Sequence, residues 1–213
     1  MNKRLGLMLG LIFLPMPGFA NDSTLSVRLG SLGFGVEAGI SLTDQFSARL
    51  GLNRYDLEFD ERVDGIEYDL DLEMRSISLL ADWHPFESSF RFTAGVFRNN
   101  SEITGATRYA ITTIGDTVYR DVGLEADLDF RSFAPYFGLG WETGLFNAHG
   151  WGFNVDLGLM YQGSGSVNLT ATGSAADLVD PNDLALEEQR FEEDIEDYKY
   201  YPVFSFGVSY RFK

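Results

Sequence analysis

The chain has 213 residues, a formal charge of −16 at pH 7 and no cysteine, and it carries 18 Phe, 10 Tyr and 23 Gly against only 6 Pro. The absence of cysteine excludes disulfides, thiolate metal sites and a cysteine nucleophile. The acidic balance makes nucleic acid a poor partner, because phosphates bind to clustered Lys and Arg. Abundant aromatic residues and glycine with few prolines favour strands over helices.

Residues 1–20 have the three parts of a secretion signal. Lys3 and Arg4 give a positive start, and the apolar run Leu5–Leu14 follows. A run of about ten residues is too short to span a bilayer as a helix. Phe19 and Ala20 then offer a cleavage site. A buried N-terminal helix is the alternative, but the run has no polar face. We therefore predict a signal peptide at 1–20 and one mature domain at 21–213.

Apolar and polar residues alternate along most of the mature chain. In one segment the apolar positions are Leu32, Phe34, Val36, Ala38, Ile40 and Leu42, with small or polar residues between them. A period of two indicates strands with one apolar and one polar face. The predicted strands are approximately 24–30, 33–42, 46–57, 68–83, 90–100, 124–142, 151–163 and 199–212. Strands of about ten residues suit a transmembrane β-barrel.

Two features leave the strand assignment open. The stretch Gly30–Gly33 is either a turn or a bulge within one long first strand, which would give an odd strand count. The apolar positions also change parity near Met74 and Arg131. Either bulges lie there, or the strands continue beyond the bilayer, where the rule for inward and outward faces no longer applies.

Short and long connections alternate along the chain. The short ones are 43–45, 85–89 and 144–150, and the long ones are about 58–67, 101–123 and 164–198. Outer-membrane barrels show this pattern, with short periplasmic turns and long outside loops. In the last long connection, Asp180 and Pro181 begin a helix that runs on to about Asp197, with proline at its first position. The predicted fold is an all-β, eight-stranded antiparallel transmembrane β-barrel with a short acidic helix in the last outside loop.

Charged residues on the polar parity are predicted to point into the barrel lumen. They are Arg28, Glu37, Arg49, Asp82, Arg91, Glu142, Asp156 and Arg211. The interior of an eight-stranded barrel is only wide enough for side chains to fill it. Four acids and four arginines should pair there, because an unpaired buried charge is costly. A plugged, ion-paired lumen is favoured over a charged channel or a catalytic acid pair.

Aromatic residues near strand ends fit the girdles of a membrane barrel. They are Trp83, Phe90, Trp141, Trp151, Tyr200 and Tyr210. The two histidines, His84 and His149, lie beside the predicted periplasmic turns, away from the outer rim where a lipid-modifying enzyme would need its base. We therefore predict no enzyme, no catalytic residue and no cofactor.

Acidic residues are concentrated in two of the long connections, between Asp56 and Glu73 and between Asp177 and Asp197. Clustered oxygen ligands could hold Ca²⁺ or Mg²⁺, the cations that also bridge lipopolysaccharide phosphates. The spacing matches no EF-hand. A solvated acidic surface is the favoured alternative, and no metal ligands are assigned.

Several segments resemble a family of uncharacterised proteobacterial outer-membrane β-barrel proteins and, more distantly, OmpA- and OmpW-type small barrels. They are 81–86, 90–95, 134–141, 161–164 and 200–212. Tyr210 and Phe212 resemble the C-terminal aromatic signal that the barrel assembly machinery reads, although Lys213 follows the phenylalanine. The resemblance implies a barrel in the outer membrane of a Gram-negative bacterium, and it carries over no activity.

Three functions remain in view at this point. The first is a non-enzymatic outer-membrane barrel with a structural or surface-interaction role and acidic outside loops. The second is a narrow passive pore or a conduit for small hydrophobic molecules. The third is a lipid-modifying enzyme. The expected partners are outer-membrane lipid and lipopolysaccharide, the assembly machinery during biogenesis, and divalent cations at the acidic loops, with no nucleic acid.

Overall fold

The computed structural model describes residues 23–63, 66–85, 89–100, 102–144 and 150–212. The predicted signal peptide at 1–20 lies outside these residues. Within them, no helix has both the length and the apolar character needed to cross a bilayer.

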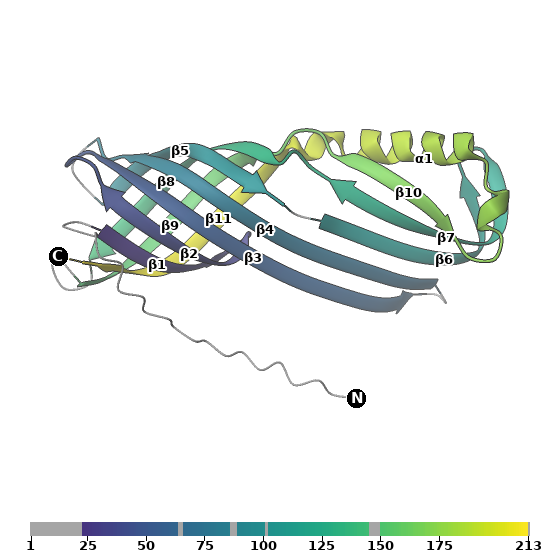
Figure 1. Cartoon of the computed structure of the whole chain (residues 1–213), viewed down its shortest axis with the longest axis horizontal. Helices are drawn as coiled ribbons and strands as arrows, with labels where there is room; N and C mark the ends of the chain where they lie inside the picture. Colours follow the sequence, from purple (N-terminus) through teal and green to yellow (C-terminus); the bar gives the residue numbers. More distant parts are fainter. Residues whose placement is uncertain (1–22, 64–65, 86–88, 101, 145–149, 213) are drawn as a thin grey trace, which may run out of the picture.

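Eight strands close into an antiparallel barrel, which confirms the predicted fold (Figure 1). They are β1 (Ser23–Gly30), β2 (Gly33–Ser41), β3 (Phe46–Val63), β4 (Ile66–Trp83), β5 (Phe90–Asn99), β8 (Phe133–Gly144), β9 (Gly150–Tyr161) and β11 (Tyr200–Arg211). Each strand pairs with the next in this order, and β1 pairs with β11 to close the ring. Closure leaves no free edge around the barrel wall.

The first two strands are separate, so the count is even. Gly30 pairs with Gly33 across a two-residue turn. Gly33 has a φ of +82°, and a Cβ on it would lie 2.4 Å from the carbonyl oxygen of Arg54. Only glycine combines that backbone conformation with so close an approach. The alternative of a bulge within one long first strand is therefore wrong.

The barrel wall is apolar on its outer surface. Alternate residues of each strand point outward and remain exposed, as Leu50, Leu79 and Leu157 do with 53%, 58% and 58% of their surface accessible. The residues between them point inward and are mostly buried, small or polar. A water-soluble barrel would have the opposite arrangement, because burying apolar surface drives its folding. This wall suits a surrounding lipid phase.

The long connections are themselves folded, and the sequence analysis did not predict this. The predicted loop 58–67 is mostly a strand hairpin, because β3 and β4 pair without interruption from Phe46 opposite Trp83 to Val63 opposite Ile66. The other two long connections contain further elements: β6 (Glu102–Ile114), β7 (Thr117–Asp129), β10 (Ser166–Thr172), η1 (Ala176–Leu178), α1 (Pro181–Asp194) and η2 (Glu196–Lys199).

These elements extend the barrel sheet at one end (Figure 1). The strand β6 pairs with β4 at Tyr68–Glu73, beyond the point where β5 stops. The strand β7 then pairs with β6, and β10 pairs with β7. We call β6, β7, β10, η1, α1 and the parts of β3 and β4 beyond Arg54 and Arg75 the arm.

The arm explains both changes of parity. Near Met74 the register between β3 and β4 has no bulge, and the other partner of β4 changes from β5 to β6. There the strand leaves the barrel and continues into the arm. Near Arg131 the single strand predicted for 124–142 is wrong, because β7 ends at Asp129 and β8 begins at Phe133. This change marks a break between two strands.

The predicted acidic helix is present as α1, but it ends at Asp194, and the predicted helical residues Glu196 and Asp197 belong to the separate short helix η2. The Asp180 side chain accepts a hydrogen bond from the backbone N–H of Asn182 at 2.9 Å, and Pro181 occupies the first turn. This is the N-cap arrangement that the sequence predicted.

The acids of α1 cap the edge of the arm sheet. Glu188 accepts a hydrogen bond from the N–H of Leu169 at 2.8 Å, and Glu192 accepts one from the N–H of Val167 at 3.1 Å. Both N–H groups belong to β10, the last strand of the sheet. An open strand edge invites pairing with other chains, so these glutamates protect an edge that would otherwise be exposed.

A pH titration tests how α1 is attached to the arm. The Tyr119 hydroxyl donates a hydrogen bond of 2.7 Å to the carboxylate of Asp183, and this bond lowers the pKa of Asp183 below its usual range. The stabilising contribution is therefore complete above the ordinary aspartate pKa of about 4. It is lost as the pH falls through the lowered value. In Y119F we expect an NMR titration to show the pKa of Asp183 moved upward, and an unchanged value would contradict the contact.

Candidate functional site: the barrel lumen

The eight charged residues assigned to the lumen all lie in one connected group of ion pairs, which we call the lumen charge network. Arg49 is at its centre. Its guanidinium contacts Asp82 (Nε to Oδ2, 2.6 Å), Glu37 (Nη1 to Oε1, 2.9 Å) and Asp156 (Nη2 to Oδ1, 3.3 Å). These four residues come from β2, β3, β4 and β9, so the contacts connect different sides of the barrel.

The other three arginines extend the network. Arg28 of β1 pairs with Glu37 at 2.8 Å and also with Asp156. Arg91 of β5 lies 2.9 Å from Asp156 and 3.2 Å from Glu142. Arg211 reaches Glu142 at 3.2 Å.

Burial divides the network into an inner part and a rim. Arg91 and Asp82 are each only 1% exposed. Arg211 and Glu142, nearer the short turns, have side chains 43% and 21% exposed. The inner charges have little access to solvent, so their mutual pairing replaces hydration.

Small inward residues make room for the network. At Gly140 a Cβ would lie 2.5 Å from Asp156 Oδ1 and 2.6 Å from Arg91 Nε. Any larger side chain at this position would displace the Arg91–Asp156 pair. Gly140 therefore provides space for Arg91, as Gly207 does for Arg28, where a Cβ would lie 3.0 Å from Arg28 Cγ.

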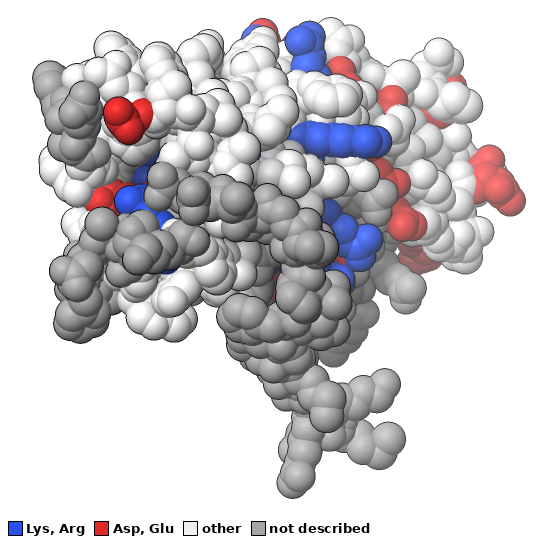
Figure 2. Space-filling model, turned by 60° about the vertical axis from the view of Figure 1, so that its left-hand side comes forward, with Lys and Arg blue, Asp and Glu red and all other residues white. Residues whose placement is uncertain are grey.

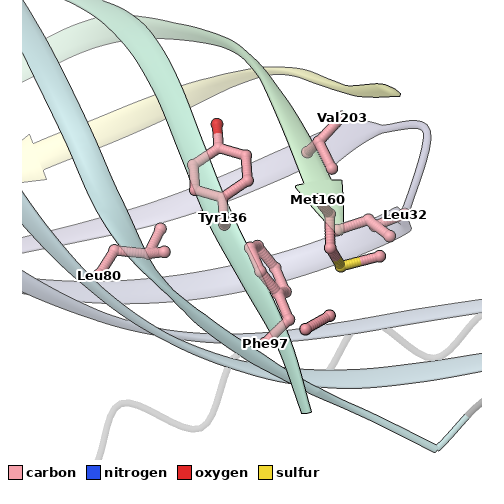
Figure 3. Close-up of a cluster of buried hydrophobic side chains, with 7 residues drawn as sticks. Leu32, Leu80, Phe97, Tyr136, Met160 and Val203 are labelled. Carbon is pink, nitrogen blue, oxygen red and sulfur yellow. The ribbon is translucent and has the colours of Figure 1, made fainter. Parts of the chain in front are cut away.

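A second, apolar layer fills the lumen between the network and the arm (Figure 3). It consists of Leu32, Leu80, Phe97, Ala134, Tyr136, Met160 and Val203. Phe97 and Tyr136 meet edge to face, with ring centroids 5.3 Å apart. Along β4 and β9 this layer follows the network directly, since Leu80 is two residues from Asp82 and Met160 four from Asp156.

The sequence analysis did not predict this layer. The sequence does contain a sign of it: Leu80, Phe97 and Met160 occupy inward positions of their strands, among mostly polar residues. Large apolar residues at such positions indicate that this part of the lumen is packed and not filled with water. Leu32 is a correction, because the alternation placed it on the outward face. It lies in the turn between β1 and β2 and is only 7% exposed, because the turn directs it into the lumen.

Two cavities lie on opposite sides of the network. The larger, about 360 Å³, opens toward the short turns and is lined by Thr24, Ser47, His84 and Asn154 together with network residues. The smaller, about 30 Å³, is lined by Arg28, Leu80, Phe97 and Tyr136 among others. The network and the apolar layer lie between the first cavity and the arm.

The described residues that line the larger cavity include Ser47, Asp82 and His84. The Ser47 hydroxyl lies 3.4 Å from His84 Nε2, at the long limit of a hydrogen bond. Asp82 is held by Arg49 and by the Thr93 hydroxyl, which donates to it at 2.6 Å. His149 lies outside the described residues.

The aromatic residues assigned to a girdle lie at both ends of the barrel. Five of them are near the short turns, where Phe90 packs on Trp141 at 5.4 Å and Trp151 on Tyr210 at 5.3 Å. There Trp83 points outward and is 45% exposed. Tyr200 is at the opposite end, 5.3 Å from Tyr161.

The residues of the predicted assembly signal lie where β11 meets β1. The Tyr210 ring is 4.9 Å from that of Phe212. The Phe212 N–H donates to the Ser23 carbonyl at 2.9 Å.

Several acids of the last connection accept hydrogen bonds within the arm. Besides the two edge-capping glutamates, Glu187 accepts a hydrogen bond from the Gly115 N–H at 3.0 Å. Among the residues whose positions are described, no three His, Asp or Glu side chains are arranged to hold a metal ion. The side chains at the tip of the β3–β4 hairpin lie outside this description, so divalent binding by the first acidic segment stays a prediction.

Together, a closed antiparallel barrel, an apolar outer wall and a charged interior define a transmembrane β-barrel. The chain matches no protein-family model and no curated protein. Two solved structures are similar over almost their whole length. Acinetobacter baumannii CarO has a TM-score of 0.60 at 20% identity, covering 90% of this chain and 97% of that one. Acinetobacter baumannii CarO2 has a TM-score of 0.63 at 20% identity, covering 90% and 98%. At this identity the likeness shows a shared fold.

Proposed function

We propose that the chain is a non-enzymatic, non-conducting outer-membrane protein of a Gram-negative bacterium that presents the arm at the cell surface for interaction. The observation that carries this proposal is the closed lumen. The charge network and the apolar layer both lie across it, and the cavity between them holds about 30 Å³.

The outward apolar wall supports a position within a bilayer. It spans all eight barrel strands, and aromatic side chains border it near the short turns. Both described ends of the chain, Ser23 and Phe212, lie at that same end. In this class of barrels the short turns face the periplasm, so the arm would face outward.

The construction of the arm supports a surface role. It has its own buried cluster of Ile114, Val122 and Val179, and a helix protects its β10 edge. A segment that is ordered and solvated in this way can present a fixed surface to a partner, at a lower entropic cost than a flexible loop.

Planar-bilayer recording tests the closed lumen. We expect the refolded protein to give negligible single-channel conductance under conditions in which an open porin conducts. Gel mobility with and without boiling should show in parallel that the barrel is folded. A steady open state from the folded protein would contradict the proposal. It would favour a narrow pore or conduit, for which the cavity of about 360 Å³ would be the entrance.

A further inference from the structure

A groove of about 600 Å³ lies on the outside of the barrel wall, where the arm begins. It is lined by Leu52, Asn53, Arg54, Arg75, Ser76, Ile77, Arg98 and Asn100. The arginines and the apolar residues among these point away from the barrel axis and are exposed, whereas Asn53 and Ser76 lie on the inward parity.

On three adjacent strands, the outward-facing residues change from apolar side chains to arginine at the same level of this wall. On the outward face Leu52 precedes Arg54 on β3, and Val96 precedes Arg98 on β5. On β4, which runs in the opposite direction, Arg75 comes just before Ile77. The strand register places Arg54 opposite Arg75, and Arg98 opposite Ile77. The apolar wall therefore ends at a row of three guanidinium groups.

The protein only partly neutralises these charges. Arg54 Nε lies 2.7 Å from Asp56, and Glu73 contacts both Arg75 and, at 3.7 Å, Arg54. Arg98 is exposed and forms no ion pair with the described part of the chain. Among the side chains that the structure describes here, three cations thus face two carboxylates, in a chain whose net charge is −16.

Grouping like charges on facing strands is unfavourable by itself. Figure 2 shows the same boundary on the surface, with white barrel wall giving way first to blue and then to red side chains toward the arm. The excess of positive charge at the end of an apolar wall therefore indicates an anionic group from outside the chain.

We propose that this groove binds a phosphorylated lipid, with the phosphate held by Arg54, Arg75 and Arg98 and the acyl chains lying along Leu52 and Ile77. The inference rests on the proposed position in the outer membrane. Guanidinium groups match phosphate with paired hydrogen bonds, and basic pockets at a membrane interface bind lipid head groups. The apolar wall directly beside the arginines is what selects a lipid over a free phosphate.

Native mass spectrometry of the full chain refolded in detergent tests this site, with bis-phosphorylated lipid A as the probe. We expect R75Q/R98Q to bind lipid A at least about tenfold more weakly than the unmodified protein, since charge-assisted hydrogen bonds of this kind are strong enough to change affinity by that factor. The control is R120Q/R131Q, which removes two exposed arginines outside the groove and should leave binding unchanged. All variants should keep the heat-modifiable mobility of a folded barrel.

Two further probes separate the sources of phosphate. Lipid A stripped of its phosphates should bind the unmodified protein about as weakly as R75Q/R98Q binds the phosphorylated form. Inorganic phosphate should not compete at millimolar concentration. Equal lipid A binding by both double variants would overturn the site, and competition by inorganic phosphate would overturn the assignment to a lipid. Neither result depends on whether the lumen conducts, so the two proposals can fail separately.

Discussion

Replacing Arg49 with methionine should lower the free energy of unfolding by about 3–5 kcal/mol, the range for breaking a buried ion pair by removing one partner. Arg49 contacts Glu37, Asp82 and Asp156 within 3.3 Å. Its loss leaves three buried carboxylates to share Arg28 and Arg91. Urea unfolding of the protein folded into lipid vesicles measures the change.

Two companion variants show whether charge is the cause. In R49M/D82N one of the stranded carboxylates is neutral, so we expect part of the lost stability to return. The loss should then be smaller than the sum of the two single losses. The exposed Arg190, which pairs with Asp116 on the arm at 2.8 Å, serves as the control, and R190M should unfold much as the unmodified protein does. An R49M protein with unchanged stability would show that the network does not hold the barrel together.

The second large effect is expected on the outer wall. Leu79 lies on β4 midway between Trp83 near the short turns and Arg75 at the start of the arm, and it is 58% exposed. An arginine near the middle of the lipid-facing surface of a barrel costs about 2–4 kcal/mol. We therefore expect L79R to lower the free energy of unfolding in vesicles by that amount.

The control for this experiment is Val118 on β7 of the arm, which is 63% exposed. If the arm lies in water, V118R should have little effect on stability, because surface substitutions away from special features usually change it only slightly. Equal losses in L79R and V118R would contradict the proposed boundary between the membrane and the arm. A tolerated L79R would contradict the position of the barrel in the bilayer.

The lumen and the arm differ in how far the sequence predicts them. The alternation of inward and outward residues was enough to predict which eight charged residues form the lumen charge network, because successive residues of a strand point to opposite faces. The inward parity also contained Leu80, Phe97 and Met160, but their apolar layer was missed. Parity tells which face a side chain occupies. It does not tell at what height side chains from different strands meet.

The amino-acid sequence by itself predicted a barrel of eight strands, their outward apolar faces and the capped helix α1, although it merged β7 and β8 into one strand. Each of these depends on local pattern: the strands on the period of two that a lipid side and a narrow lumen impose, and the helix on its N-cap Asp180 and on Pro181. Most residues of the predicted short turns 85–89 and 144–150 lie outside the described part of the chain. Only the tertiary structure decided that the long connections form β6, β7 and β10, that β4 exchanges β5 for β6 near Met74, and that glutamates of α1 cap β10. The strands of the arm also alternate, as Val167 and Leu169 of β10 do, but their pairing partners are distant in the chain and are not encoded in the local pattern.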